Sequence, residues 1–434
     1  MDYPELLKYF DEHWLKRSTN ETLADYPFDD LRALLAERGD PQRAVATAHI
    51  TGSKGKGSTA TLIAAILGSH GLRVGTFTSP HLVDVEERIR IGGTPIDRES
   101  FARYVGEEIA AARQRGDEAR FIWRLIFVAA LRVFRDRGVD AAAIEVGAGG
   151  RFDPTNIVAP VVACLTPISL EHVPRLGTTL AEIAAQKVAI VKSGSVAISA
   201  AQTATVHATI AAGAALAGAP LLRVGDRVHL HVHARDPSGT RLTARVGNLT
   251  VSDVHLPLLG AHQVENLAMA LLASDEMLRA LGRRLDPAST VVGVGRATWP
   301  GRLVRLGRDP DLLYDGAHTP ESAAALAGAL RDHFPRRRWR LVVGLVGRRD
   351  PGAFLAPLAA IAGEIVAVPV PGFDAVDPFA IAAAARAHGI SSVVVDALED
   401  ALASGAERDV CVTGSLYLYA RTLRYTGGAT TLRG

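Results

Sequence analysis

The sequence feature that most constrains this chain is a glycine-rich run, Thr51-Gly52-Ser53-Lys54-Gly55-Lys56-Gly57-Ser58. Residues 46–50 before it have the apolar pattern of a short buried strand, and residues 59–69 after it have the apolar spacing of a helix. A strand, a glycine-rich turn with Lys and Ser, and then a helix form the layout of a phosphate-binding P-loop. The run therefore predicts an α/β fold that binds a nucleotide phosphate where the first strand ends.

The residue types in this loop suit the chemistry of phosphate binding. Its glycines let backbone N–H groups turn toward phosphate oxygens, and the following helix adds the positive end of its dipole. Lys56 would carry a cation to the terminal phosphates, and Ser58 would offer a hydroxyl to Mg²⁺. The hydroxyl stands one residue later than usual, because Gly57 follows Lys56. We expect the whole loop to contact ATP, that is Gly52, Ser53, Lys54, Gly55, Lys56, Gly57 and Ser58.

Length and composition exclude several classes of protein. At 434 residues the chain is too long for one ordinary domain. A formal net charge of +2 gives no bulk attraction to nucleic acid or to an anionic membrane. Cys164 and Cys411 lie in apolar runs, which excludes a disulfide framework and fits a reducing compartment. Since the first residues lack a signal-peptide core and no apolar run is long enough to span a membrane, we expect a cytoplasmic enzyme.

The first part of the chain alternates strands with helices, beginning with amphipathic helices up to about residue 44. Further strands are predicted at residues 73–78, 141–146 and 161–166, and helices near residues 100–115 and 120–137. This alternation favours a mostly parallel sheet, whose ligands bind at the carboxyl ends of the strands. Four polar residues fall at such ends: Ser58, Ser79, Glu145 and His172.

Residues 222–256 have a different pattern, in which apolar and polar residues alternate with period two. The pattern predicts a small antiparallel meander that is inserted in the first sheet or lies at its edge. Three histidines, His229, His231 and His233, share one face of its first strand. A metal site there is conceivable, but no Cys or acid joins them, so a solvent-facing surface is favoured.

A second α/β alternation begins after a Gly- and Pro-containing connector at residues 293–300. Its strands are predicted at residues 312–314, 340–344, 364–368, 392–395 and 410–413. We therefore expect an α/β protein with two domains. Residues 1–294 would form a P-loop domain with a mostly parallel sheet and a small antiparallel insertion, and residues 295–434 a Rossmann-like domain.

Nine motifs in order resemble those of one family, the folylpolyglutamate synthase / dihydrofolate synthase family of the Mur ligase superfamily. The P-loop comes first; the others are Thr78-Ser79-Pro80-His81-Leu82 with Glu87-Arg88-Ile89, Glu145-Val146-Gly147 with Gly149-Gly150-Arg151, Glu171-His172, Glu182-Ile183 with Lys187 and Ile190, His262-Gln263 with Asn266, Pro300-Gly301-Arg302, Asp315-Gly316-Ala317-His318, and Thr413-Gly414-Ser415. The resemblance spans residues 49–419. It implies an ATP-dependent amide ligase, in which a substrate carboxylate becomes an acyl phosphate and the amine of L-glutamate attacks it. The expected partners are a folate-like carboxylate and L-glutamate, and we expect a monomer.

The resemblance also implies roles for individual residues. Ser79, Glu145 and His172 would bind Mg²⁺, as one or two ions, and the oxygens of Ser58, Ser79 and Glu145 suit that hard cation. Lys187 matches a lysine that the family often carries as a carbamate, whereas the alternative is an unmodified helix lysine in a salt bridge. The residues expected to act in catalysis are Lys56, His172, Lys187 and His318.

Three residues outside the P-loop match ATP contacts of the family. Asn266 suits the adenine edge, Arg302 the phosphates, and Asp315 the ribose or the surroundings of the incoming amine. The alternatives are a packed or capping Asn266 and a plain ion pair between Arg302 and Asp315. Because Asn266 precedes the connector and the other two follow it, the resemblance implies that ATP is held between the two domains. Closure of the domains would then protect the acyl phosphate from water.

Some positions depart from the family pattern, chiefly in the parts that would hold the acceptor. Thr319 stands where Asn is usual, Glu171 where Asp is usual, and Glu86 precedes Glu87-Arg88. Pro154 follows a loop that borders the pterin in folate enzymes, and residues 17–34 lack an expected Leu-Gly-Leu-Glu-Arg-like segment. Two other functions therefore stay open. One is a Mur-type ligase for a non-folate carboxylate. The other is a nucleotide-binding regulator that hydrolyses ATP slowly. The second is disfavoured by the presence, at the positions matching the family, of Glu145, His172 and Lys187.

Overall fold

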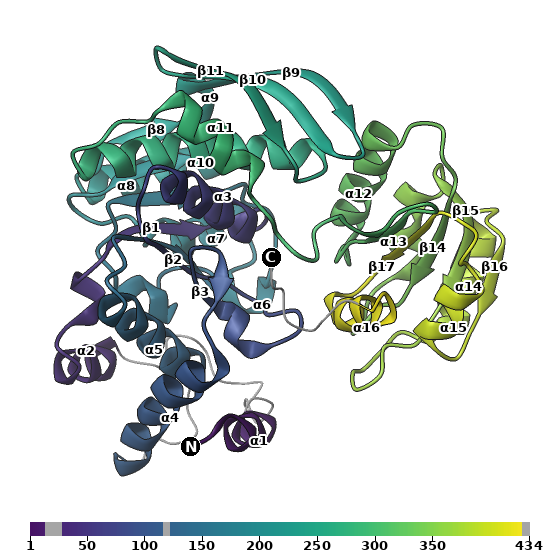
Figure 1. Ribbon diagram of the computed structural model, residues 1–434, viewed down its shortest axis with the longest axis horizontal. Helices are drawn as coiled ribbons and strands as arrows, with labels where there is room; N and C mark the ends of the chain where they lie inside the picture. The colour runs from purple at the N-terminus through teal and green to yellow at the C-terminus, as the bar shows by residue number, and fades with distance from the viewer. Residues whose placement is uncertain (14–27, 116–121, 428–434) are drawn as a thin grey trace.

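The computed structural model describes residues 1–13, 28–115 and 122–427. Figure 1 shows two bodies side by side, the first drawn in purple through teal to green and the second in lighter green to yellow. We call them the N-terminal lobe, which runs from helix α1 to helix α11, and the C-terminal lobe, which runs from strand β12 to helix α16. Each lobe is built around a mostly parallel sheet, as the sequence predicts.

Within the described residues, the N-terminal lobe has an eight-stranded sheet of order β4-β3-β2-β5-β1-β6-β7-β8. The strands are β1 Ala46–Thr51, β2 Val74–Phe77, β3 Ile89–Ile91, β4 Thr94–Pro95, β5 Ala141–Glu145, β6 Val162–Leu165, β7 Val196–Ser199 and β8 Leu221–Arg223. All neighbours from β2 to β8 pair in parallel, whereas β3 and β4 pair antiparallel at one edge. Because β1 lies in the middle of the parallel strands, the loop that follows it opens at the centre of the sheet's carboxyl edge.

Helices cover both faces of this sheet. One face packs on α3 Lys56–Ser69 and α10 Ala261–Ala280, and the side chain of Ile50 on β1 is fully buried among them. The other face packs on α4 Arg98–Gln114 and α5 Ile122–Asp136. The remaining helices of the lobe are α1 Tyr3–His13, α2 Phe28–Glu37, α6 Val173–Leu176, α7 Leu180–Val188, α8 Ala204–Leu216, α9 Val224–Arg227 and α11 Pro287–Gly295.

The predicted helices before the first strand are present as α1 and α2, whose apolar residues Leu6, Phe10 and Leu35 enter the core beside α4 and α5. Part of the region that departs from the family pattern, residues 17–27, lies outside the described residues. The predicted start of the helix at residue 120 also lies outside them, and α5 is described from Ile122 onward.

The predicted meander exists, but it forms a sheet of its own. Strands β9 Val228–Asp236, β10 Gly239–Val246 and β11 Leu249–Leu256 pair in the order β11-β10-β9. They do not extend the main sheet, whose edge is β8, because their apolar face packs on α10 and α11. The histidines at positions 229, 231 and 233 are exposed, as predicted for a solvent-facing surface.

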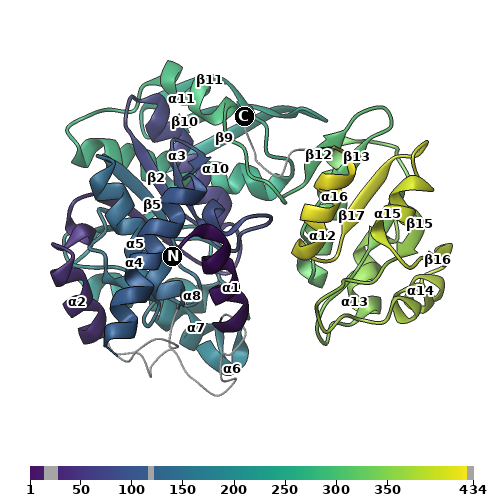
Figure 2. The same ribbon diagram turned by 60° about the horizontal axis from the view of Figure 1, so that its bottom comes forward.

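The C-terminal lobe has a sheet of order β12-β13-β17-β14-β15-β16. Its strands are β12 Val304–Gly307, β13 Leu312–Tyr314, β14 Trp339–Val343, β15 Ala362–Ala367, β16 Ser392–Val394 and β17 Val410–Thr413. Its helices are α12 Pro320–His333, α13 Pro351–Leu355, α14 Pro378–Ala387, α15 Leu398–Ala403 and α16 Tyr419–Tyr425. The sequence predicted every strand except β12, a four-residue edge strand that pairs antiparallel with β13 and is half-buried throughout. Figure 2 shows this lobe beside the first.

Three parts of the N-terminal lobe contact the C-terminal lobe: the β9–β10 hairpin, the residue before α10, and the loop after β2. In Figure 1, the β9–β10 hairpin extends from the N-terminal lobe to α12. Leu259, just before α10, is buried in the core of the C-terminal lobe, and Leu82 packs against that lobe as well. No helix in the described part of the chain is both long and apolar enough to cross a membrane.

Candidate active site

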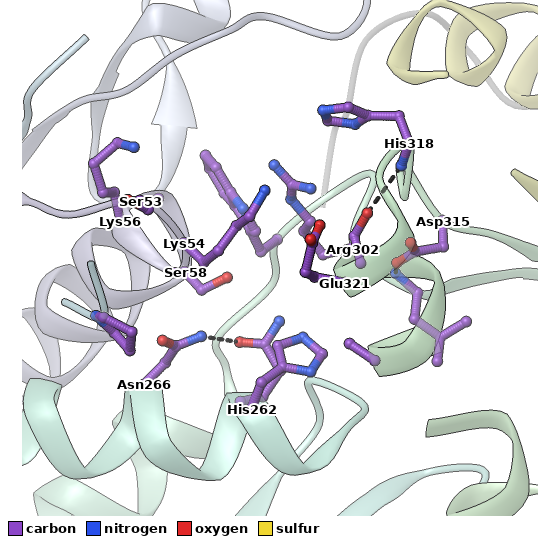
Figure 3. A pocket seen from close by; sticks show the side chains of 18 of the residues that line it. Ser53, Lys54, Lys56, Ser58, His262, Asn266, Arg302, Asp315, His318 and Glu321 are labelled. Carbon is purple, nitrogen blue, oxygen red and sulfur yellow. Dashed lines mark hydrogen bonds between the residues drawn. The ribbon is translucent and has the colours of Figure 1, made fainter. Parts of the chain in front are cut away.

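A cavity of about 440 Å³ lies between the two lobes. Figure 3 shows Lys54 and Ser58 of the P-loop on one side of it and Asp315, His318 and Glu321 of the C-terminal lobe on the other, above the first turns of α10. The predicted site residues that line it are Ser53, Lys54, Gly55, Lys56, Gly57, Ser58, Ser79, Glu145, His172, Asn266, Arg302, Asp315 and His318. The structure therefore brings together residues that are up to 265 positions apart in the sequence.

The P-loop runs from the end of β1 at Thr51 to the start of α3 at Lys56. Gly55 caps α3 with a φ of 85°, in the left-handed region. A Cβ atom on Gly52 would lie 1.8 Å from Thr166 Oγ1, and one on Gly55 would lie 2.2 Å from Asn266 Oδ1. Glycine is required at both positions because the backbone turns this closely against neighbouring side chains.

Two lysines meet at one carbonyl group of the loop. Lys56 Nζ and Lys187 Nζ each donate a hydrogen bond to the carbonyl oxygen of Gly52, both at 2.9 Å. Lys187 also forms an ion pair with Glu171, at 2.7 Å between Nζ and Oε1. Burial, helped by the charge of Lys56, lowers the pKa of Lys187 to about 8. Although burial acts in the opposite direction, the charges of Lys187 and Lys56 lower the pKa of Glu171.

Lys187 thus has the salt bridge of an unmodified helix lysine, which is one of the two alternatives that the sequence left open. The other alternative, the carbamate, needs a neutral amine, since CO₂ adds only to an uncharged nitrogen. With a pKa of about 8, roughly one amine in ten is neutral at pH 7. The Lys187 side chain is 1% exposed, and this burial disfavours the charged form of its amine.

The residues expected to bind Mg²⁺ line the same cavity, at the ends of β5 and β2 and the start of α6. Glu145 Oε2 accepts a hydrogen bond from the backbone N–H of Ser79 at 2.8 Å. Burial raises the pKa of Glu145 in spite of the nearby charge of Lys56. His172, at the start of α6, is exposed. The described residues contain no group of three or more His, Cys, Asp or Glu side chains that could hold a metal, so a cation here would need the hydroxyls of Ser58 and Ser79.

The first turns of α10 form the floor of the cavity. Asn266 Nδ2 donates a hydrogen bond to Gln263 Oε1 at 2.9 Å, which fixes the orientation of the Asn266 amide. That amide lies against Gly55 of the P-loop (Figure 3). One turn earlier, burial lowers the pKa of His262 to about 4, so its imidazole is neutral.

In the C-terminal lobe, Asp315 and His318 follow β13 and face the P-loop. Asp315 accepts backbone hydrogen bonds from Leu303 and Ala317, both at 2.8 Å, and so ties the residue before β12 to the β13–α12 loop. Burial raises the pKa of Asp315, although the charge of Arg302 opposes the rise. His318 Nδ1 donates to the carbonyl oxygen of Gly316 at 2.8 Å, and burial lowers its pKa to about 4. Its Nε2 atom therefore carries a lone pair.

Several lining residues were not predicted as site residues. Trp299 of the connector packs on Gly57, where an added Cβ would come within 2.5 Å of Trp299 Cζ2. Glu321, in the first turn of α12, faces Lys54 across the cleft (Figure 3). His262, Gln263 and Glu171 were seen only as parts of motifs. The signal for Trp299 was its place directly before Pro300-Gly301-Arg302, whereas no local signal marks Glu321, because its contact depends on how the lobes meet.

Comparison with protein families gives two matches along the chain. The Mur ligase middle domain matches residues 124–274, and the glutamate ligase domain of Mur ligases matches residues 301–416. The first match covers β5, which carries Glu145, and the start of α10. The second begins next to Arg302 and covers Asp315 and His318.

Individual relatives agree over most of their length. The chain is 33% identical to a folylpolyglutamate synthase of Lacticaseibacillus casei over 91% of this chain and 92% of the relative. It is also 33% identical to a dihydrofolate synthase/folylpolyglutamate synthase of Mycobacterium tuberculosis, over 86% of this chain and 80% of the relative.

Solved structures have the same fold. A Mycobacterium tuberculosis folylpolyglutamate synthase complexed with ADP and AMPPCP superposes with a TM-score of 0.87 at 28% identity, covering 98% of both chains. A folylpolyglutamate synthase complex with AMPPCP and folate superposes with a TM-score of 0.83 at 30% identity, covering 98% of this chain and 99% of that one. Since sequence identity and fold agree over nearly the whole length, and the two domain matches are those of Mur ligases, this chain belongs to the folylpolyglutamate synthase / dihydrofolate synthase family of Mur ligases.

Proposed function

We propose that this protein is an ATP-dependent ligase that joins L-glutamate to the carboxylate of a folate, releasing ADP and phosphate, and that dihydropteroate is a second acceptor. The relatives support folate over another carboxylate, because they are folylpolyglutamate synthases and dihydrofolate synthases. A related structure holds both an ATP analogue and folate.

The observation that carries the proposal is the cavity between the lobes, which the P-loop faces from one side and Arg302, Asp315 and His318 face from the other. A triphosphate on the P-loop would point its γ-phosphate toward the C-terminal lobe. We propose that residues 1–294 act as the ATP-binding domain and residues 295–434 as the glutamate ligase domain. The ATP site would then be complete only when both domains contact the nucleotide.

The chemistry is phosphoryl transfer followed by attack of an amine. The acceptor carboxylate takes the γ-phosphoryl group and becomes an acyl phosphate, and the glutamate nitrogen then displaces phosphate to form the amide. Phosphoryl transfer needs positioned groups and compensation of negative charge more than covalent help. Lys56, once it leaves the carbonyl of Gly52, can reach the phosphates. Neutral His318 can accept a hydrogen bond from the incoming amine.

We propose that Mg²⁺ binds beside the phosphates, held by Glu145 with Ser58, Ser79 and His172. The donor set fits, since carboxylate and hydroxyl oxygens are the ligands this hard cation prefers. The raised pKa of the buried Glu145 carboxyl also indicates that its charge is incompletely compensated. When bound, the ion would compensate the negative charge of the phosphates.

We further propose that Lys187 is carbamylated in the active enzyme. Its pKa of about 8 supports this, because the neutral amine is accessible near physiological pH. The carbamate would be an anion, so the ion pair with Glu171 would have to open as it forms. We also propose that the protein works as a cytoplasmic monomer, where Cys164 and Cys411 stay buried as free thiols.

Release of ADP, measured with each acceptor, tests the function. We expect ADP to form only when ATP, glutamate and either tetrahydrofolate or dihydropteroate are present together, and to be lost in the Lys56→Ala variant. ADP that forms equally without any pterin would identify a slow ATPase. Failure of every pterin, with stimulation by another carboxylate, would favour the non-folate Mur-type ligase.

A further inference from the structure

One buried imidazole joins the two lobes outside the cavity. His333 is the last residue of α12 and is 0% exposed. Its Nε2 atom accepts a hydrogen bond from the backbone N–H of Gly260 at 3.0 Å. Its Nδ1 atom lies 2.8 Å from the carbonyl oxygen of Asp236. A backbone N–H can only donate and a carbonyl can only accept, so the ring is neutral, with its proton on Nδ1.

Both partners of this imidazole belong to the N-terminal lobe. Gly260 caps the N-terminus of α10, and Asp236 ends β9 at the tip of the hairpin that extends to α12 (Figure 1). An ion pair between Arg235 and Asp332, at 3.6 Å, lies beside it. His333 therefore sits where the end of β9, the start of α10 and the end of α12 meet.

The position matters because α10 and α12 are two walls of the cavity. The first turns of α10 supply His262, Gln263 and Asn266. The facing side of α12 supplies residues from Glu321 to Ala329, and His333 is four residues, about one turn, beyond Ala329. A Cβ on Gly260 would lie 3.3 Å from the Ala329 methyl group, so the two helices are already close at this point.

We propose that His333 is a positioning residue for the nucleotide: as a neutral imidazole, it holds the start of α10 against α12 and so sets the spacing of the two helical walls. The proposal rests on the proposed function in that the occupant of the cavity is ATP. His333 does not line the cavity, so its effect passes through Gly260 to His262 and Asn266, which do.

A proton on Nε2 would abolish the bond to Gly260, because an N–H would then face another N–H. Burial and the charge of Arg235 oppose that proton, whereas the carbonyl and charge of Asp236 and the charge of Asp332 favour it; the balance lowers the pKa of His333. His262 on α10 also faces it. Acidification should therefore weaken this contact and with it the binding of ATP.

Two substitutions separate the two hydrogen bonds. His333→Gln places an amide oxygen where Nε2 was and can still accept from Gly260, whereas His333→Asn keeps only a donor at the place of Nδ1. We expect His333→Asn to raise the KM for ATP about tenfold, the effect of one lost hydrogen bond, with kcat at saturating ATP nearly unchanged. His333→Gln should stay within about threefold of the wild type. As the pH falls from about 6.5 toward the lowered pKa of His333, the KM of the wild type should rise more than that of His333→Gln.

His388→Asn is the matched control, since the His388 side chain bonds to the carbonyl oxygen of Gly352 within the C-terminal lobe. The proposal is overturned if the Gln and Asn variants show equal increases in the KM for ATP together with equal losses of thermal stability. His333 would then have only a packing role. If His333→Asn does not fold, the pH dependence of His333→Gln decides. Direct titration with AMPPCP separates the two proposals. If the wild type binds no nucleotide, the proposed function is wrong. If the wild type binds AMPPCP and the His333 variants bind it equally well, only the positioning role of His333 is wrong.

Discussion

At the scale of single residues, the P-loop glycines are the most sharply defined positions. Gly55 has a φ of 85°, and a Cβ there would lie 2.2 Å from Asn266 Oδ1. We predict that Gly55→Ala lowers kcat/KM for ATP by about 100-fold, because the loop or Asn266 must move by an appreciable fraction of an ångström. The left-handed backbone adds a loss of about 1–2 kcal/mol in the free energy of unfolding. Steady-state kinetics and urea unfolding measure the two effects.

The matched control is Gly68→Ala at the other end of α3, where an added Cβ meets nothing within 4 Å. This substitution should leave kcat/KM unchanged and raise helix stability by up to about 1 kcal/mol. If both alanine variants kept full activity, the close packing of Asn266 on the loop would not be needed for the reaction with ATP.

Lys187 gives a second prediction at this scale. After incubation with ¹³C-labelled bicarbonate and Mg²⁺, the wild type should show a carbamate carbon in its NMR spectrum that is absent from Lys187→Ala. Amide synthesis by Lys187→Ala should fall by about 100-fold or more. Loading with CO₂ should increase as the pH rises toward about 8, because the neutral fraction of the amine increases in that direction.

Lys192→Ala is the comparison, since burial also lowers the pKa of Lys192 but its Nζ bonds to the carbonyl of Ala189 outside the cavity. It should keep both the carbamate signal and the activity. Unchanged amide synthesis in Lys187→Ala would remove Lys187 from the mechanism.

At the scale of elements, the start of α12 shows how Thr319 serves in place of the family's usual Asn. Thr319 caps α12, and its Oγ1 accepts a hydrogen bond from the backbone N–H of Ser322. We predict that Thr319→Asn leaves the thermal midpoint nearly unchanged, because both residues cap well, while Thr319→Ala costs about 1 kcal/mol in the free energy of unfolding. Thr203→Ala at the start of α8 should cost much less, since the Thr203 side chain makes no capping bond. A loss in Thr319→Asn as large as that in Thr319→Ala would contradict the capping role.

The elements that the sequence predicted well are those with local signals. The strand–loop–helix unit at residues 46–69 carried its own glycines and periodicity, and the strand that ends at Glu145 is a continuous apolar run. Because carboxyl ends of parallel strands meet at one sheet edge, the gathering of Ser58, Ser79 and Glu145 followed from topology alone.

The features that the sequence could not predict depend on contacts between distant segments. The meander forms a separate sheet because its apolar face meets α10 and α11, which periodicity does not reveal. Strand β12 has four half-buried residues and too little pattern to be recognised. The bonds of Asp315 to Leu303 and of His333 to Gly260 join different parts of the chain, so no local spacing encodes them.

At the scale of the whole molecule, several buried histidines make stability depend on pH. Burial lowers the pKa of His49 to about 3, and that of His262 and His318 to about 4. In the unfolded chain these groups titrate near about 6.5. Between the two values the unfolded state binds more protons than the folded one, so the free energy of unfolding falls as the pH falls. The contribution of each histidine is complete above about pH 6.5 and is lost below it, by up to about 1.4 kcal/mol per pH unit.

His49 isolates one such contribution, because it is 0% exposed beneath the P-loop on β1. Its Nε2 bonds to Thr155 Oγ1 at 2.9 Å, and its Nδ1 has no hydrogen-bond partner among the described residues. We predict that the thermal midpoint of the wild type falls as the pH drops from about 7 to about 5, and that His49→Asn, although less stable at pH 7, falls less steeply because one titrating group is gone. The exposed strand residue His229, changed to Asn, should leave the slope unaltered. Parallel slopes in all three proteins would show that a protonated His49 is tolerated in the fold, and that acid stability is set elsewhere.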